Sequence, residues 1–357
     1  MTAKYPYAPD YAVAPGVTLK ETLDAKGLSQ ADLAIRTGLA EKTVSQIING
    51  IGPITYETAG KLEFAVGIPA RFWNARERSY REALVRNEET ERLEQDVGWL
   101  KELPLEVLID RGHINKDEDK RSLVRQALRF FGVSSVNAWR DVWERPCVQF
   151  RGAGAHKKHP GHVAAWVRLG EIAAESLVCE AYNARRFHEV LRELRSLTSE
   201  SAATWRREVV RRCAAVGVAV VFVKEIPGAG VSGITRWITK DKALIQLSLK
   251  YKTDDRLFFS FFHEAGHVLL HGKRKVFVEY GESDSVEERE ADGFASDILI
   301  PDDRIRSLLY LKTRPDIIAF ARMLNIAPGI VVGRMQHDGV MPRSHCNDLK
   351  RKLVWKD

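Results

Sequence analysis

The stretch FFHEAGHVLLHG (261–272) has His263 and His267 four residues apart, with Glu264 directly after the first histidine. An α-helix turns once in about 3.6 residues, so the two imidazoles project from one face and can meet a single metal ion. Glu264 lies about a hundred degrees around the helix from His263, where a base for a metal-activated water belongs. The pattern therefore predicts a zinc site with Glu264 as its catalytic base.

The residues around this pattern, LFFSFFHEAGHVLL (257–270), are apolar and predict a buried helix. Buried imidazoles and carboxylates are costly unless they are paired or bound to metal, which favours a metal site. We expect Gly266 to leave room beside the metal. His271 lies one turn beyond His267. Three positions spaced four apart along one helix span too far for one ion, so we do not expect His271 to be a third ligand. It is either a helix-end residue interacting with the helix dipole or a neighbour of the site.

A third ligand is expected because a catalytic zinc commonly has three protein ligands and one open position. The segment SVEEREADGFASDILI (285–300) predicts a helix, with Ser285 as N-cap and Glu288 at capping-box spacing. Glu288 and Asp292 share a helix face, so we expect Glu288 to be the ligand and Asp292 to hold a histidine ring from behind. A solvated helix N-terminus, favoured by the dipole, is the alternative for this acidic cluster. The fallback ligands are Glu287 and Glu290.

Short runs rich in β-branched residues flank the motif helix and predict a small sheet. These runs are GVAVVFVKEI (217–226), VSGITRW (231–237), ALIQLSL (243–249) and KVFVEY (275–280). Much of the remaining chain has apolar residues at three- and four-residue spacing, which indicates helices. The expected fold class is therefore α+β and mostly helical.

A second signature is LSQADLAIRTGLAEKTVSQIING (28–50), which predicts two short helices with Ser29 as the first N-cap and a turn at Gly38. The second helix, over residues 40–49, presents a polar face whose side chains can contact bases and phosphates in the major groove. The candidate DNA-binding residues are Glu41, Lys42, Thr43, Ser45, Gln46 and Asn49. On periodicity alone, a plain helical hairpin with a polar face is an equal alternative.

The motif pair HEAGHVLLH and EREADGFASDILIP resembles the ImmA/IrrE family of metallo-endopeptidases, whose motifs are H-E-x-G-H-x-x-x-H and E-x-x-A-[ND]-x-F-A. The resemblance covers residues 205–305 and implies zinc-assisted amide hydrolysis. It implies that the zinc ligands are His263, His267 and Glu288 and that Glu264 is the catalytic base. Candidates for stabilising the oxyanion are Tyr280, His271 and Arg274.

Residues 16–83 resemble the HigA-type antitoxin branch of the XRE (Cro/cI-like) DNA-binding family. The marks of that branch are the segments INGIGPIT and PARFWNARERSY. The resemblance implies a five-helix helix-turn-helix domain that binds palindromic operator DNA as a homodimer, because two recognition helices must reach successive grooves.

Composition sets the frame for both motifs. The chain has 357 residues, a formal net charge of +7 and a sequence pI near 9.1, which permits but does not demonstrate binding to phosphates. Its four cysteines are scattered singly and predict neither disulfides nor a cysteine-rich zinc site. The N-terminus lacks the apolar core of a signal peptide and no apolar run is long enough to span a membrane, so we expect a cytoplasmic protein.

We expect five segments from this organisation. They are a lead-in (1–15), a DNA-binding domain (16–83), a helical linker domain (84–204), a zinc-peptidase domain (205–305) and a C-terminal helical extension (306–357). The expected function is a transcriptional regulator of the toxin–antitoxin or phage/stress type that cleaves a repressor or an antitoxin. The alternative is a HigA-like antitoxin or repressor with a toxin partner, in which the zinc domain is a non-catalytic sensor or docking module.

Overall fold

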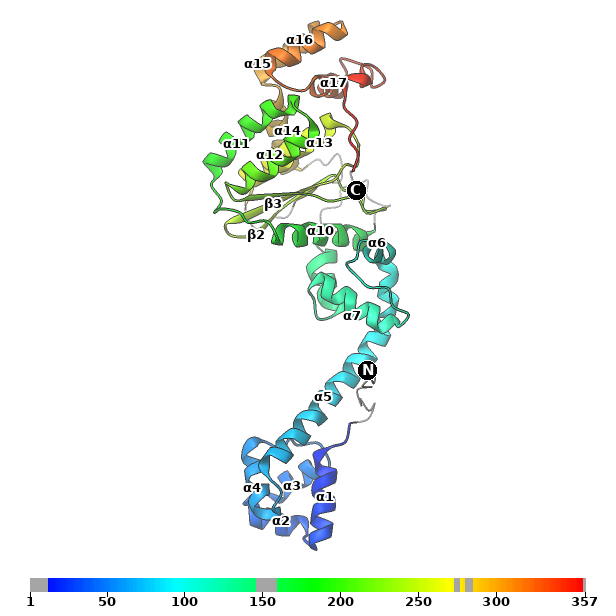
Figure 1. Ribbon diagram of the computed structural model, residues 1–357, viewed down its shortest axis with the longest axis vertical. Coiled ribbons are helices and arrows are strands. Elements are labelled where there is room, and N and C mark those ends of the chain that lie inside the picture. Colours follow the sequence, from blue (N-terminus) through cyan, green and yellow to red (C-terminus); the bar gives the residue numbers. More distant parts are fainter. Residues whose placement is uncertain (1–11, 146–158, 273–276, 280–284, 356–357) are drawn as a thin grey trace, which may run out of the picture. The chain divides into compact units, whose positions relative to one another are not determined.

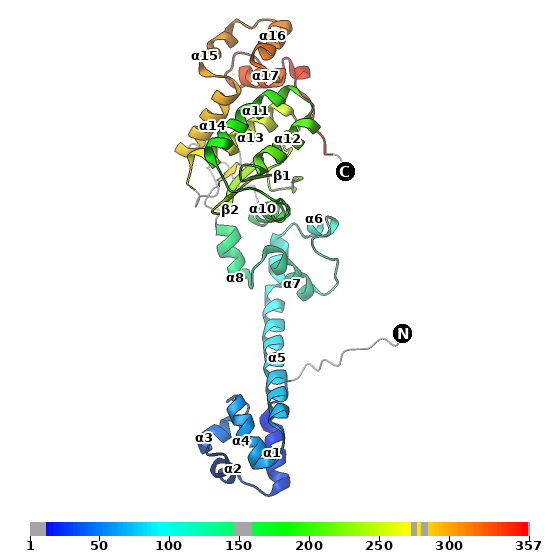
Figure 2. The same cartoon turned by 60° about the vertical axis from the view of Figure 1, so that its left-hand side comes forward.

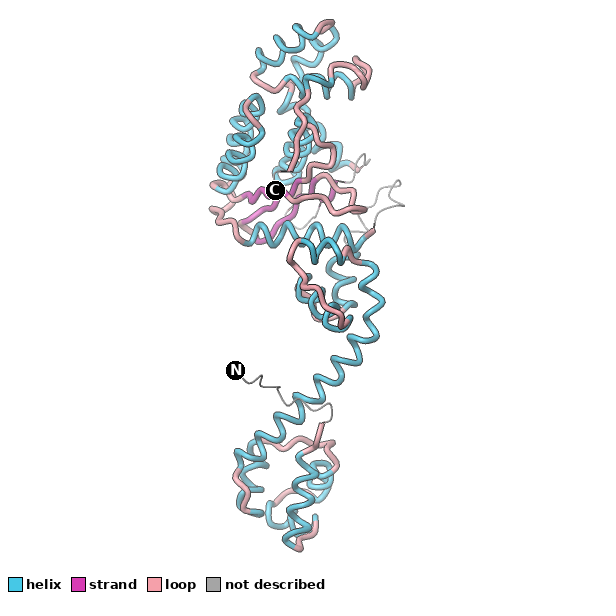
Figure 3. The backbone as a smooth tube through the Cα atoms, turned by 45° about the vertical axis from the view of Figure 1, so that its right-hand side comes forward, coloured by secondary structure: helices cyan, strands magenta, loops and turns pink. Residues whose placement is uncertain are grey.

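The computed structural model describes residues 12–145, 159–272, 277–279 and 285–355. The chain folds into two compact units, Met1–Val97 and Gly98–Asp357. Helices dominate both, and all strands of the described residues lie in the second, as the colours of Figure 3 show. The expected α+β, mostly helical class is therefore confirmed.

The described part of the first unit has five helices, with α1 and α4 beside the N-terminal part of α5 and with α2 and α3 packed against α1 and α4 (Figure 2). Its core contains Leu19, Leu33, Ile47, Leu62 and Trp73, all at most 2% exposed. The helices are α1 (Pro15–Lys26), α2 (Gln30–Thr37), α3 (Glu41–Ile48), α4 (Tyr56–Val66) and α5 (Ala70–Gln95).

Local signals fix the ends of α2, the first of the two helices that the second motif predicts. The Ser29 hydroxyl accepts a hydrogen bond from the Asp32 backbone N–H at 3.0 Å, and the Asp32 carboxylate accepts one from the Ser29 N–H at 2.9 Å. This reciprocal capping box begins α2. Gly38 ends it with φ at 66°, a left-handed conformation that glycine adopts without steric cost. The predicted pair of helices around a tight turn is confirmed.

The second unit begins with short helices that precede the sheet. Among them, the Trp139 ring meets Trp99 and Phe131 edge to face, with ring centroids 5.3 and 5.7 Å away. The elements are η1 (Asp96–Glu102), α6 (Leu105–Asp110), α7 (Lys120–Phe131), α8 (Val136–Trp139), η2 (Arg140–Glu144), α10 (Pro160–Glu175), α11 (Ala184–Ser196), η3 (Leu197–Ser199) and α12 (Ala202–Ala214).

The sheet has four strands in the order β1-β3-β2-β4. β1 pairs with β3 in parallel, whereas β2 is antiparallel to both β3 and β4. Helix α10 covers one face, and α11, α12 and α13 lie on the other (Figure 1). The strands are β1 (Val218–Phe222), β2 (Gly233–Thr239), β3 (Lys242–Leu247) and β4 (Phe277–Glu279), so each of the four predicted runs overlaps a strand.

Helix α13 (Asp254–Leu270) carries the first motif and packs its aromatic side against the core. The Trp205 ring meets Phe258 and Phe261 at centroid distances of 4.8 and 5.3 Å. The C-terminal elements share this core through Ile317 and Val331. They are α14 (Val286–Leu299), α15 (Asp302–Ile305), η4 (Arg306–Tyr310), α16 (Arg314–Leu324), α17 (Pro328–His337) and η5 (Asn347–Leu349).

Helix α5 runs without a break through residue 83, where the sequence suggested a boundary, so the proposed segment limits stay predictions. Within the described ranges, no single helix is both long and apolar enough to cross a membrane. Only α16 and α17 taken together meet those criteria, and they are bent by 112°.

Candidate metal centre

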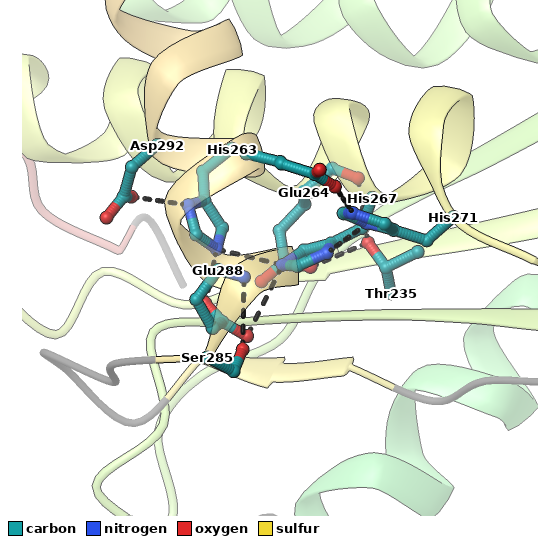
Figure 4. A network of polar contacts seen from close by, with 9 residues as sticks. Thr235, His263, Glu264, His267, His271, Ser285, Glu288 and Asp292 are labelled. Atoms are coloured by element: carbon teal, nitrogen blue, oxygen red, sulfur yellow. Dashed lines mark hydrogen bonds and ion pairs between the residues drawn. The ribbon is translucent and has the colours of Figure 1, made fainter.

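Three side chains from two helices meet beside the sheet (Figure 4). His263 and His267 come from α13 and are 2% and 1% exposed, and Glu288 comes from the first turn of α14. The Nε2 atoms of the two histidines are 3.0 Å apart. The Glu288 carboxylate lies 3.1 Å from Nε2 of His263 and 3.5 Å from Nε2 of His267. The structure thus brings together the three residues expected to bind the metal.

The outer nitrogen of each ring is held by a further group. Asp292 Oδ1 lies 2.7 Å from His263 Nδ1, as expected from the sequence. His267 Nδ1 lies 2.9 Å from His271 Nδ1, and His271 Nε2 is 3.0 Å from Glu290. Because carboxylates only accept, neutral rings donate outward along both chains, and both Nε2 atoms keep their lone pairs.

This donor set fits a zinc ion. Two lone pairs and a carboxylate converge on one point, an arrangement that is repulsive unless a cation or proton lies between them. Ligands about 2.05 Å from a tetrahedral zinc are about 3.3 Å from one another. The observed separations of 3.0, 3.1 and 3.5 Å bracket that value. Among the described residues, these three form the one group whose donors suit a metal.

Glu288 is positioned by the start of its helix. The Ser285 hydroxyl accepts a hydrogen bond from the Glu288 N–H at 3.1 Å, which caps α14. The other hydrogen bond of a capping box would run from the Ser285 N–H to the Glu288 carboxylate. The Glu288 carboxylate instead faces the two histidines. Burial opposes its ionisation, but in the metal-free site hydrogen bonds from both histidines and their positive charge, once the rings are protonated, lower the pKa of Glu288 to about 2. The group is therefore an anion over the whole working pH range.

Glu264 is fully buried, and its partner is a residue that the sequence did not indicate. Thr235 on β2 directs its hydroxyl at Glu264, with Oγ1 2.6 Å from Oε2 and 2.9 Å from the backbone oxygen (Figure 4). A threonine in a predicted strand carries only the ordinary strand signal. No motif spacing links it to a helix 29 positions away in the sequence.

Gly266 has a different role from the one expected. A Cβ there would lie 3.2 Å from both the Ala291 backbone and the Phe294 ring of α14. The glycine therefore lets α14 approach α13 closely, and through that approach it places Glu288 near the histidines. The room it leaves is filled by Ala291 and Phe294 of α14.

The remaining predicted residues are placed as follows. His271 is the C-cap of α13, and its ring contacts His267, so the helix-end role and the role in the site coexist. The fallback ligand Glu290 contacts His271 instead of the metal ligands, and Glu287 is half-buried on α14. Tyr280 and Arg274 lie outside the described residues.

In the first unit, α3 buries Val44, Ile47 and Ile48 and turns its polar side outward. The Asn49 amide donates to the Ser45 backbone oxygen at 2.9 Å. The six candidate DNA-binding residues are exposed or half-exposed: Glu41, Lys42, Thr43, Ser45, Gln46 and Asn49.

Two family models match separate parts of the chain. Residues 19–73 match the helix-turn-helix family model, and residues 218–325 match the model of the IrrE N-terminal-like domain. No curated protein matches the chain.

Two solved structures resemble part of the chain. A Nostoc punctiforme protein, described as an antidote of a plasmid maintenance system, is 26% identical, with a TM-score of 0.23; the match covers 24% of this chain and 92% of that one. An addiction module antidote of the HigA family from Coxiella burnetii is 24% identical, with a TM-score of 0.22 and coverage of 24% and 94%. The two family matches settle the assignment: the chain carries an N-terminal helix-turn-helix DNA-binding domain of the XRE type and a C-terminal IrrE-like peptidase domain.

Proposed function

We propose that this protein is a DNA-binding transcriptional regulator whose C-terminal domain is a zinc metallo-endopeptidase that hydrolyses a peptide bond in a regulatory protein. The observation that carries the proposal is the convergence of His263, His267 and Glu288 beside the buried carboxylate of Glu264. A purely structural zinc site commonly has four protein ligands, whereas a catalytic one has three and keeps a position open.

The residues of this chain divide the chemistry among them. His263, His267 and Glu288 would hold zinc, and Asp292 and His271 would fix the orientation of the two rings. Zinc bound there would polarise the scissile carbonyl and make an attacking water more acidic. Glu264 takes the proton of that water on its carboxylate and returns it to the leaving amine.

The DNA-binding part of the proposal rests on α3. Its buried residues anchor the helix in the core of the first unit, while Lys42 and Gln46 lie on the outward side. Lysine suits phosphate contacts and an amide suits an adenine edge in the major groove. We expect operator DNA with two half-sites and a homodimer, because one recognition helix reads only one half-site.

The substrate we expect is a repressor or an antitoxin, this chain included, because DNA binding directs the peptidase to regulatory targets. The test is a comparison of new protein N-termini in cells that produce the wild type or Glu264→Gln. The substitution keeps the size of the side chain but removes the base, so termini that form only with the wild type identify the cleaved bond.

Zinc content and operator binding should be equal in the wild type and Glu264→Gln. Identical termini in the two strains, with zinc and DNA still bound, would contradict the peptidase and favour the alternative. In that alternative, the protein is a HigA-like antitoxin or repressor whose zinc domain senses a signal or docks a toxin.

A further inference from the structure

Strand β2 contacts the carboxylate of Glu264 through two residues, Gly233 and Thr235. Thr235 and Gly233 are two positions apart, so they face the same side of the sheet, toward α13. Thr235 is 1% exposed, and its hydroxyl reaches two oxygens of one residue, the Oε2 and the backbone oxygen of Glu264. One side chain thus holds both the carboxylate of Glu264 and the helix turn that carries it.

Gly233 supplies the space for this contact. A Cβ at Gly233 would lie 2.4 Å from Glu264 Oε1 and 2.9 Å from its Cγ. The backbone of Gly233 does not require glycine, since its φ is not among the positive values found at other glycines. The absence of a side chain is therefore explained by the space that the Glu264 carboxylate occupies.

The backbone at Gly233 and Thr235 is held in place because β2 is paired with a strand on each side. Thr235 pairs with Ile245 of β3 and with Phe277 of β4, and Gly233 pairs with Leu247 and Glu279 on the same two strands. A β-branched side chain in a strand also has restricted χ1 freedom. Strand pairing and rotamer preference together fix where the Thr235 hydroxyl lies.

We propose that Thr235 is a positioning residue for the general base, and that Gly233 and Thr235 together set the orientation of the Glu264 carboxylate. This inference rests on the proposed peptidase function. A base must lie within hydrogen-bond reach of the proton that it takes, and small misplacements of a catalytic group cost rate. The role needs no contact with substrate or metal, because Thr235 acts only through Glu264.

The experiment compares Thr235→Val, which keeps the shape of the side chain but removes the hydroxyl, with Thr235→Ser, which keeps the hydroxyl. The substrate is the peptide bond found by the comparison of wild type and Glu264→Gln. We expect Thr235→Val to lower kcat by about 10- to 100-fold with KM and zinc content unchanged. Thr235→Ser should restore most of kcat.

Thr198→Val is the matched control, because Thr198 is also fully buried in this unit and its hydroxyl donates to the Arg195 backbone oxygen. It should lower thermal stability without changing kcat. An unchanged kcat in Thr235→Val, or equal losses in Thr235→Val and Thr235→Ser at full zinc content, would overturn the proposal.

A second measurement does not depend on activity. In a crystal structure of full-length Thr235→Val, the Glu264 carboxylate should move away from residue 235 or occupy several rotamers. In Thr235→Ser it should stay in place. A Glu264 side chain that stays in one unchanged position in Thr235→Val would overturn the proposal even if no substrate is cleaved. Failure of the peptidase function itself would appear separately, as absence of cleavage by the wild type.

Discussion

Asp292 on α14 accepts a hydrogen bond from His263 on α13, with Oδ1 2.7 Å from Nδ1. The contact joins the two motifs of the metal centre and fixes the tautomer that points Nε2 of His263 at Glu288. The Asp292 side chain is 54% exposed, so its removal should cost little stability.

We therefore predict that Asp292→Ala lowers zinc affinity by about 10- to 100-fold while the protein stays folded. Competition with a chelator of known affinity measures this change. Asp297→Ala is the control, since Asp297 is an exposed acid of the same helix that accepts a hydrogen bond from the Asp302 N–H. Equal zinc affinities in the two variants would contradict the assigned role of Asp292.

Zinc binding should weaken in acid because protons compete for the histidines. The pKa of Glu288 is about 2, so this ligand stays ionised. Burial lowers the pKa of His267 below 6.5, although its hydrogen bond to Glu288 opposes that effect. Affinity should therefore be level from about pH 8 down to 6.5 and fall only at lower pH, by about tenfold per pH unit once the His267 ring takes up a proton. Chelator competition across this range tests the prediction, and a loss already complete at pH 7 would be inconsistent with it.

The start of the motif helix depends on the C-terminal segment of the chain. The Asp254 carboxylate is 1% exposed, and its Oδ2 lies 2.6 Å from Nε of Arg351. Arg351→Met leaves a buried carboxylate without its cation. We expect a loss of about 2 kcal/mol in the free energy of unfolding, less than the about 3–5 kcal/mol of a fully buried pair because Arg351 is partly exposed.

Chemical denaturation of the full chain measures the change caused by Arg351→Met. Arg314→Met removes the same kind of side chain from a surface pair with Asp348, whose side chains are 57% and 55% exposed. It should cost at most about 1 kcal/mol. Equal losses in the free energy of unfolding for the two variants would show that the buried Asp254–Arg351 pair contributes no more to stability than a surface pair.

Lys42 should contribute to DNA affinity without selecting sequence. It is exposed at the start of α3, where a lysine can neutralise a phosphate. Lys42→Met should weaken binding to specific and nonspecific duplexes alike and reduce the salt dependence by about one unit of slope. Lys61→Met on α4 is the control, because Lys61 is paired with Glu57 at 2.8 Å. Equal salt slopes for Lys42→Met and the wild type would exclude the phosphate contact.

The sequence alone determined the local features of both motifs. Helical periodicity makes His263 and His267 neighbours in any α-helix, and it places Glu288 and Asp292 on one face of the next. The residues that begin and end helices, such as Ser29 before α2 and Gly38 after it, act within a few positions of the chain. These relationships could be predicted because each depends on spacings of four residues or fewer.

Tertiary structure decided which faces meet. Three contacts join residues that are 19 to 29 positions apart in the sequence. They are the pairing of His271 with Glu290, the close approach of α14 to Gly266 and the hydrogen bond of Thr235 to Glu264. Periodicity defines a face of a helix or strand, but the partner of that face depends on how elements cross and how strands pair. For this reason the sequence identified the candidate metal ligands and the candidate base, while only the packing of α13 against β2 and α14 revealed what orients them.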